Sequence, residues 1–169
     1  GVTALMDAAG YGHLSVLLLL LQHSANPDLQ NIAGVTALMT AAYKGHEACV
    51  KALLRAKANT DLQDIDGVTA LMGTAQEAQE ACVQALLQAK ADPDLQNHFG
   101  GTALMAATDG GHVACVRALL RAKANTELLD KDGLTALQYA EAKGHTAIAK
   151  LIRQHAAPPP PAAAMAPQA

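Results

Sequence analysis

Short blocks of apolar residues with a helical period alternate with glycine-containing turns along most of the chain. After Gly34, apolar positions within Ala37–Ala42 and within Glu47–Ala56 recur at the three- and four-residue spacing of one helix face. Thr36 stands where its hydroxyl can cap the first block, and Gly45 separates the two blocks. The residues after the second block are polar and rich in turn formers. The pattern predicts a helix, a tight turn, a second helix and an exposed connector.

The sequence Gly-x-Thr-Ala-Leu recurs at a fixed spacing of 33 residues, beginning at Gly1, Gly34, Gly67, Gly100 and Gly133. A fixed period of this length indicates stacked units of secondary structure rather than one globular core. We expect the units to be residues 1–33, 34–66, 67–99, 100–132 and 133–157. A Pro/Ala-rich flexible tail is expected at residues 158–169, and the alternative is a docking peptide for an aromatic-lined groove.

The motifs of each unit resemble the ankyrin repeat. Asp64–Met72 and Asp130–Leu137 are similar to the family's Asp-x-x-Gly-x-Thr-Pro-Leu-His, and a Gly-His pair recurs at Gly12, Gly45, Gly111 and Gly144. The resemblance covers residues 1 to about 155. It implies an all-α fold: an ankyrin-repeat solenoid of stacked helix-turn-helix units joined by β-hairpin-like loops.

The chain departs from the family pattern at three kinds of position. Alanine replaces the proline after threonine, and the family's histidine becomes Met6, Met39, Met72, Met105 or Gln138. The family's glycine after the second helix becomes Ser24, Lys57, Lys90 or Lys123. Whether the second helix still ends in a left-handed residue is therefore open. In the third unit Ala78-Gln79 replaces Gly-His. Because a left-handed L-residue is strained, we expect a reshaped, extended turn there and easy local opening around residues 73–82.

Composition excludes several classes of function. The net charge is −3 and no basic run occurs, which disfavours a nucleic acid partner. The longest apolar run, Val16–Leu21, is too short to span a bilayer, so we expect no membrane insertion of this segment, although docking on a membrane complex is compatible with it.

The second helix of the first unit has an apolar residue, Leu18, where later units have Lys51, Gln84, Arg117 and Lys150. Because the chain also starts inside a unit, we expect upstream sequence or another subunit to cover this helix.

Cysteine and histidine each form a ladder with one residue per unit. Stacked helices lie roughly 8–10 Å apart, too far for a disulfide, so we interpret Cys49, Cys82 and Cys115 as buried thiols. Reduced cysteines favour an intracellular location, the cytoplasm first, with an organelle or the nucleus as open alternatives. Single histidines, one per unit (His13, His46, His112, His145), do not form a zinc pair, and the resemblance implies that they brace neighbouring loops. No catalytic motif occurs, so we expect a non-enzymatic protein with no cofactor and no metal.

The resemblance implies that a protein partner binds on a concave surface of loop tips and first helices. Carried over position by position, the predicted partner-binding residues are Tyr11, Ile32, Val35, Tyr43, Lys44, Ile65, Asp66, Val68, Gln76, Glu77, His98, Phe99, Asp109, Lys131, Asp132, Leu134 and Lys143. Three of the four aromatic residues of the chain fall in this set, as expected of binding hot spots. Tyr139 is the exception and is expected to pack inward.

The sequence therefore predicts a scaffold for protein–protein recognition. Two alternatives stay open: a structural linker subunit of a large complex, and a targeting or regulatory fragment of a larger enzyme or membrane protein. One fold hosts many functions, so the resemblance names no partner.

Overall fold

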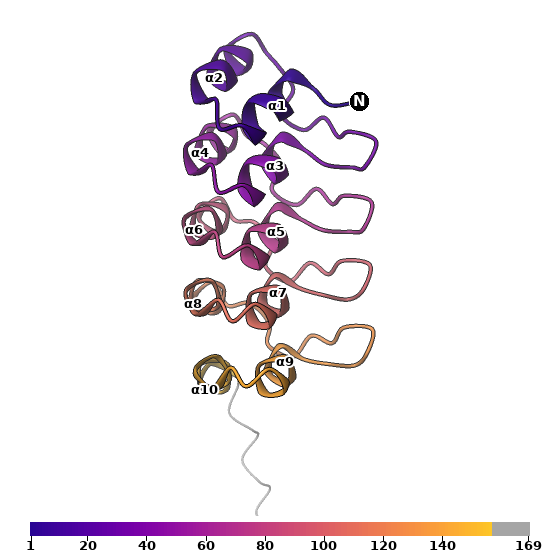
Figure 1. Cartoon of the computed structure of the whole chain (residues 1–169), viewed down its shortest axis with the longest axis vertical. Helices are drawn as coiled ribbons and strands as arrows, with labels where there is room; N and C mark the ends of the chain where they lie inside the picture. Colours follow the sequence, from indigo (N-terminus) through magenta and orange to yellow (C-terminus); the bar gives the residue numbers. More distant parts are fainter. Residues whose placement is uncertain (157–169) are drawn as a thin grey trace, which may run out of the picture.

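A computed structural model describes residues 1–156 and shows a stack of helix pairs (Figure 1). The first helix of each pair lies beside the loops. These inner helices are α1 (Ala4–Gly10), α3 (Ala37–Tyr43), α5 (Ala70–Gln76), α7 (Ala103–Asp109) and α9 (Ala136–Ala142). The second helices form an outer column: α2 (Leu14–Gln22), α4 (Glu47–Arg55), α6 (Glu80–Gln88), α8 (Val113–Arg121) and α10 (Thr146–His155). The predicted helical solenoid is confirmed, whereas the predicted tail at residues 158–169 lies outside the described residues.

Each inner helix begins at a threonine N-cap, as the sequence predicts. The hydroxyl of Thr36 accepts a hydrogen bond of 3.2 Å from the backbone N–H of Met39. Thr3, Thr69, Thr102 and Thr135 cap their helices in the same way. The cap satisfies one of the amides that the first turn leaves unpaired, and it fixes where the helix begins.

The turn between the two helices of a pair needs one left-handed residue. Gly12, Gly45, Gly111 and Gly144 supply it with φ values of 70–75°, which glycine adopts at little steric cost. Ala78 adopts the same conformation with φ 56°, and α5 ends at Gln76 like the other inner helices. The expectation of a reshaped, extended turn in the third unit is therefore wrong. Stacking on both sides holds the turn in the common form, including the hydrogen bond from the Gln79 N–H to the Thr74 carbonyl.

The outer helices keep left-handed ends without glycine. Ser24, Lys57, Lys90 and Lys123 have φ values of 63–65°. At the end of α4 the N–H of Lys57 donates to the Leu54 carbonyl, and the next N–H donates to the Leu53 carbonyl. These two hydrogen bonds are the Schellman motif, which satisfies carbonyls at the helix end. The family's geometry is thus retained, at the cost of placing a side chain where glycine is unstrained.

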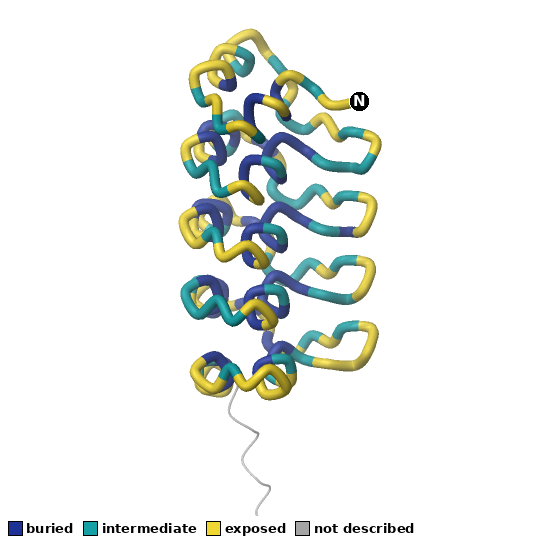
Figure 2. The backbone as a smooth tube through the Cα atoms, in the orientation of Figure 1, coloured by how far each residue is buried: buried dark blue, intermediate teal, exposed yellow. Residues whose placement is uncertain are grey.

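One continuous core runs between the two helix columns. Leu38, Leu71 and Leu104 of the inner helices and Leu53 and Leu86 of the outer helices are almost completely buried. Figure 2 shows the buried residues along the inside of both columns and the exposed residues at the loop tips. Small alanines fill the remaining buried positions, which allows the helices of neighbouring pairs to approach closely.

The loops are joined to one another by a hydrogen-bond ladder. The Nε2 of Gln63 donates to the Gly67 carbonyl in its own loop at 2.7 Å and to the Gln96 carbonyl in the next loop at 3.0 Å. Gln30 and Gln96 make the same pair of contacts. The loop tips also pair through the backbone, for example from the Ile65 N–H to the Ala33 carbonyl. The loops therefore form one continuous surface beside the inner helices.

Candidate partner-binding surface

The inner helices and the loops enclose a groove that runs along the stack; we call it the inner groove. It consists of three hollows in chain order. The first, of about 400 Å³, lies against Met6 and Tyr11, and the second, of about 230 Å³, lies against Met39 and Tyr43. The third, of about 520 Å³, lies between α5, α7 and the loop that precedes α9. Thr40 and Lys44 line the first two hollows, and Val68 lines the last two, so the groove is continuous.

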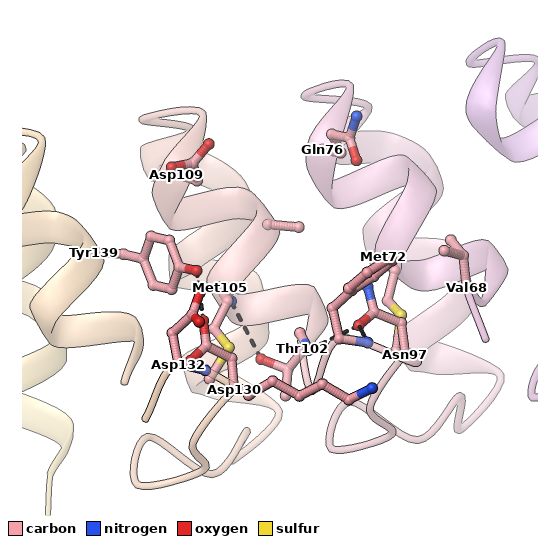
Figure 3. A pocket seen from close by; sticks show the side chains of 14 residues that line it. Val68, Met72, Gln76, Asn97, Thr102, Met105, Asp109, Asp130, Asp132 and Tyr139 are labelled. Atoms are coloured by element: carbon pink, nitrogen blue, oxygen red, sulfur yellow. Dashed lines mark hydrogen bonds between the residues drawn. The ribbon is translucent and has the colours of Figure 1, made fainter. Parts of the chain in front are cut away.

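The depth of the groove depends on one variable position of the inner helices. This position carries Thr40, Gly73 and Ala106 in α3, α5 and α7, and these small side chains leave the second and third hollows open. A methyl group added at Gly73 would come within 3.6 Å of the Tyr43 ring, an ordinary contact, so the space beside Gly73 is real. Tyr139 fills the same position in α9, and it bounds the third hollow (Figure 3).

A row of methionines forms the floor of the groove. Met6, Met39, Met72 and Met105 stand where the family has histidine, and each lines one of the hollows although most of its surface is buried. The thioether is flexible and polarisable, and it adapts to apolar groups of different shape. Sequence reasoning noted these residues only as departures from the family pattern and missed them as groove residues. The signal that could have found them is their recurrence every 33 residues.

The third hollow carries most of the charge of the groove. The hydroxyl of Tyr139 donates to Asp130 Oδ2 at 2.6 Å, and Figure 3 shows this contact at the wall of the hollow. This hydrogen bond, supported by the Leu134 N–H, lowers the pKa of Asp130 below its usual value. The same bond, with partial burial and nearby negative charge, raises the pKa of Tyr139 to about 12. Asp130 is therefore ionised and Tyr139 neutral near neutral pH.

Two lysines reduce the negative charge of this hollow: Lys131 lines it, and Lys143 pairs with one of its carboxylates. Lys143 Nζ pairs with Asp109 Oδ1 at 3.0 Å, and both side chains are exposed. Lys131 Nζ lies 5.9 Å from the centre of the Phe99 ring. Three carboxylates and one ammonium group line the hollow itself, so its lining carries net negative charge.

The structure brings part of the predicted set together in the inner groove and leaves the rest outside its lining. Those that line the inner groove are Tyr11, Val35, Tyr43, Lys44, Val68, Gln76, Phe99, Asp109, Lys131 and Asp132. Those outside its lining are Ile32, Ile65, Asp66, Glu77, His98, Leu134 and Lys143, all of them exposed. Besides the methionines, the groove residues that sequence reasoning missed include Asn97, Thr102, Asp130 and Tyr139. Tyr139 is half-buried, so it packs inward as expected and still borders the groove.

The histidine ladder braces successive pairs, as the resemblance implies. The Nε2 of His46 lies 3.1 Å from the Gly10 carbonyl, and His112 and His145 reach the carbonyls of Gln76 and Asp109. Gln79 lies against Gly45 at the corresponding place, and no such hydrogen bond is found for it in residues 1–156. The rings therefore hold the end of one inner helix to the turn of the next pair.

The cysteine ladder lies in the core. Cys49, Cys82 and Cys115 are buried free thiols, in agreement with the prediction. Burial raises the pKa of all three, and that of Cys82 reaches about 11 with a further contribution from Glu47. A thiol with a raised pKa is a poor nucleophile and metal ligand, which fits a packing role.

None of the ten described helices combines the length and the apolar character that a bilayer span requires.

Comparison with known proteins gives one result, a match to a family model. No curated protein matches the sequence. A family model described as ankyrin repeats (3 copies) matches residues 5–97 and again residues 71–160. Together with the helix pairs, the left-handed turns and the histidine braces, this match shows that the chain belongs to the ankyrin repeat family.

Proposed function

We propose that this chain is a non-enzymatic scaffold that holds a segment of a protein partner in the inner groove. Ankyrin repeats are in general protein–protein interaction modules. The observation that carries the proposal is the continuity of the groove: three hollows in a row share lining residues, and together they extend over the five inner helices. A continuous groove suits a chain segment, whereas a small molecule is usually enclosed by a single pocket.

The lining indicates which chemistry the segment presents. In the second hollow, Met39, Tyr43 and Val68 surround the open space at Gly73, which suits an apolar side chain. The third hollow combines apolar walls with carboxylates, which suits a side chain with an apolar stem and a cationic or hydrogen-bonding end. Phe99 is 66% exposed at the edge of this hollow, and exposed aromatics are enriched among binding hot spots.

The test is affinity capture of partners on immobilised chain, followed by affinity measurement for each partner recovered. Phe99→Ala and Tyr43→Ala are each expected to weaken binding by about 1–2 kcal/mol, or roughly 5–30-fold in dissociation constant. Both side chains are exposed, so the melting temperature is expected to change little. Arg117→Ala is the matched control, because Arg117 is exposed on the outer helix α8.

Three outcomes contradict the proposal. The first is a partner whose affinity is unchanged by both groove variants. The second is an equal loss of affinity in Arg117→Ala, since that would place binding on the outer column. The third is a steep fall in melting temperature for Phe99→Ala, which would make Phe99 a structural residue.

A further inference from the structure

The three hollows of the inner groove differ in charge. The first hollow is lined by one carboxylate, Asp7, and the second by one carboxylate, Asp64, while Lys44 lines both. The third hollow is lined by three carboxylates and by a single ammonium group, that of Lys131. The largest excess of negative charge in the groove therefore lies in the third hollow.

Two carboxylates of the third hollow can still accept hydrogen bonds. Asp130 Oδ1 accepts from the backbone N–H groups of Asp132 and Leu134, both at 2.9 Å, and its Oδ2 accepts from Tyr139 at 2.6 Å. A carboxylate offers about four acceptor sites, so one site of Asp130 is left. Within residues 1–156, the carboxylate of Asp132 has neither a hydrogen bond nor an ion pair. Figure 3 shows these acidic side chains beside Tyr139 at one end of the hollow.

The two lysines leave part of this charge uncompensated. Lys143 neutralises Asp109, since the two side chains form an ion pair at 3.0 Å. Lys131 lies over the ring of Phe99, and its charge balances one of the two remaining carboxylates. One negative charge is left over, and a partner group with a single positive charge complements it.

The rest of the lining suits a long side chain with an apolar stem. Met72 and Met105 form the floor, Phe99 lies at the edge and Tyr139 forms the end wall. Arginine matches this lining, because its methylene groups pack on apolar surface and its planar guanidinium stacks on aromatic rings. Its five donors also reach acceptors that lie apart from one another, whereas lysine has three donors on one nitrogen.

The neighbouring hollow provides an apolar position in register with this end of the groove. The space beside Gly73 is bordered by Met39, Tyr43 and Val68. Two helix intervals separate Gly73 in α5 from Tyr139 in α9, and packed helices lie roughly 8–10 Å apart. An extended chain advances about 3.3 Å per residue, so it covers this distance in about six residues, or in about three where the arginine side chain spans one interval.

We propose that the partner segment inserts an arginine into the third hollow, with its guanidinium at Asp130 and Asp132, and an apolar side chain beside Gly73 in the second hollow. The two anchors are about three to six residues apart in the segment. This inference rests on the proposed function, because it specifies which segment the inner groove holds. A segment with a neutral or acidic side chain in place of the arginine is rejected, since it leaves the carboxylates covered and unpaired.

The first test is selection of random dodecapeptides, displayed on phage, on the immobilised chain. Twelve extended residues span about 40 Å, which is roughly the length of the four intervals between the five inner helices. The enriched sequences are expected to share an arginine and an apolar residue three to six positions away, always on the same side. Their affinities as synthetic peptides, measured by fluorescence polarisation, are expected to fall in Phe99→Ala and Tyr43→Ala.

The second test is a double-mutant cycle between the peptide and the chain. Citrulline keeps the shape of arginine and removes its charge, and this replacement is expected to raise the dissociation constant at least about tenfold on the wild-type chain. On Asp132→Asn the same replacement is expected to cost at least about threefold less. The matched control is Asp66→Asn, because Asp66 is exposed at the same position of an earlier repeat and lies outside the lining of the groove. In this variant the cost of citrulline is expected to equal that in the wild type.

The apolar anchor is tested by Gly73→Thr, which introduces the residue found at Thr40 of α3. The fold is therefore expected to accept the change, while the added side chain fills the space beside Tyr43. Affinity for the selected peptides is expected to fall at least about fivefold. The cost of replacing arginine with citrulline is expected to stay as in the wild type, because the third hollow is unchanged.

The outcomes separate this inference from the proposed function. Peptides that lose affinity in Phe99→Ala but lack arginine, or that accept citrulline at no cost, overturn the arginine inference and leave groove binding in place. Binding of N-acetylarginine amide as tight as that of a whole peptide also overturns it, because the third hollow would then be a small-molecule pocket. If no sequence is enriched, or if the enriched peptides are unaffected by both Phe99→Ala and Tyr43→Ala, the inference and the proposed function both fail.

Discussion

Replacing Ala78 with glycine is expected to stabilise the stack. Ala78 has φ 56°, and the corresponding residues Gly12, Gly45, Gly111 and Gly144 have φ 70–75°. The Cβ is the only side-chain atom of Ala78, and a methyl group takes part in no hydrogen bond. The backbone geometry is already that of the glycine turns, so the substitution needs no rearrangement.

The expected gain follows from two opposing effects. A left-handed conformation costs an L-residue about 1–2 kcal/mol. Glycine loses more conformational freedom on folding, which costs about 0.5–1 kcal/mol relative to alanine. The balance is a gain of about 0.5–1 kcal/mol in the free energy of unfolding for Ala78→Gly. Adding Gln79→His is expected to increase it, because His46, His112 and His145 brace the neighbouring turns and Gln79 does not.

Urea unfolding measures the gain, and the midpoint is expected to rise while the slope stays constant. Ala81→Gly is the matched control: Ala81 is exposed in the first turn of α6, where glycine is expected to lower stability by up to about 0.5–1 kcal/mol, its cost in a helix interior relative to alanine. Amide hydrogen exchange is expected to be faster around residues 73–82 than at the Gly45 and Gly111 turns, and slower again in the variant. A loss of stability in Ala78→Gly, or equal protection of all these turns in the wild type, would refute the reasoning.

Three further predictions concern the core and the loops. Thr108→Val is expected to raise the free energy of unfolding by about 1 kcal/mol, because the buried Thr108 hydroxyl has no protein partner in residues 1–156. Thr74→Val is expected to lower it, because the Thr74 hydroxyl donates to the helix backbone. Urea midpoints that shift in the same direction in both variants contradict this. Gln63→Leu is expected to lower the free energy of unfolding by about 1 kcal/mol, since two carbonyls lose their donor; an unchanged urea midpoint contradicts it. For Cys82 the unfolded chain releases the thiol proton near pH 9 and the folded chain near 11, so stability is full below pH 9 and falls between 9 and 11. Urea midpoints measured across this pH range follow the fall, and Cys82→Ala must make the midpoint less dependent on pH.

The helices and their caps could be predicted from sequence because they depend on local chemistry. Thr36 caps α3 and Gly45 turns the chain, and both roles follow from the residue and its immediate neighbours. Ala78 and Lys57 show where local reasoning fails. Each takes a left-handed conformation that its type disfavours, because hydrogen bonds at the turn and helix pairs on either side fix the geometry. In a stack of near-identical units, the neighbours determine the backbone more strongly than a single residue does.

The candidate surface could be predicted in position but not in shape. Register within the repeat was enough to place Tyr43 and Phe99 on the loop side, where both are exposed. It could not show that Met72 lines a hollow while mostly buried, because that depends on how much of its surface the neighbouring side chains leave open. Sequence reasoning also treated Tyr139 as only a packing residue, whereas Tyr139 borders the groove and its hydrogen bond lowers the pKa of Asp130.

The shape of the groove is set by residues that hardly affect the fold. The backbone geometry repeats from pair to pair, yet the position that faces the groove changes from Thr40 to Gly73, Ala106 and Tyr139. Such changes alter the depth of each hollow while the buried leucines and the threonine caps behind it stay the same. If the groove holds a partner segment as proposed, specificity can therefore vary one hollow at a time, because a rigid stack keeps the spacing between hollows constant.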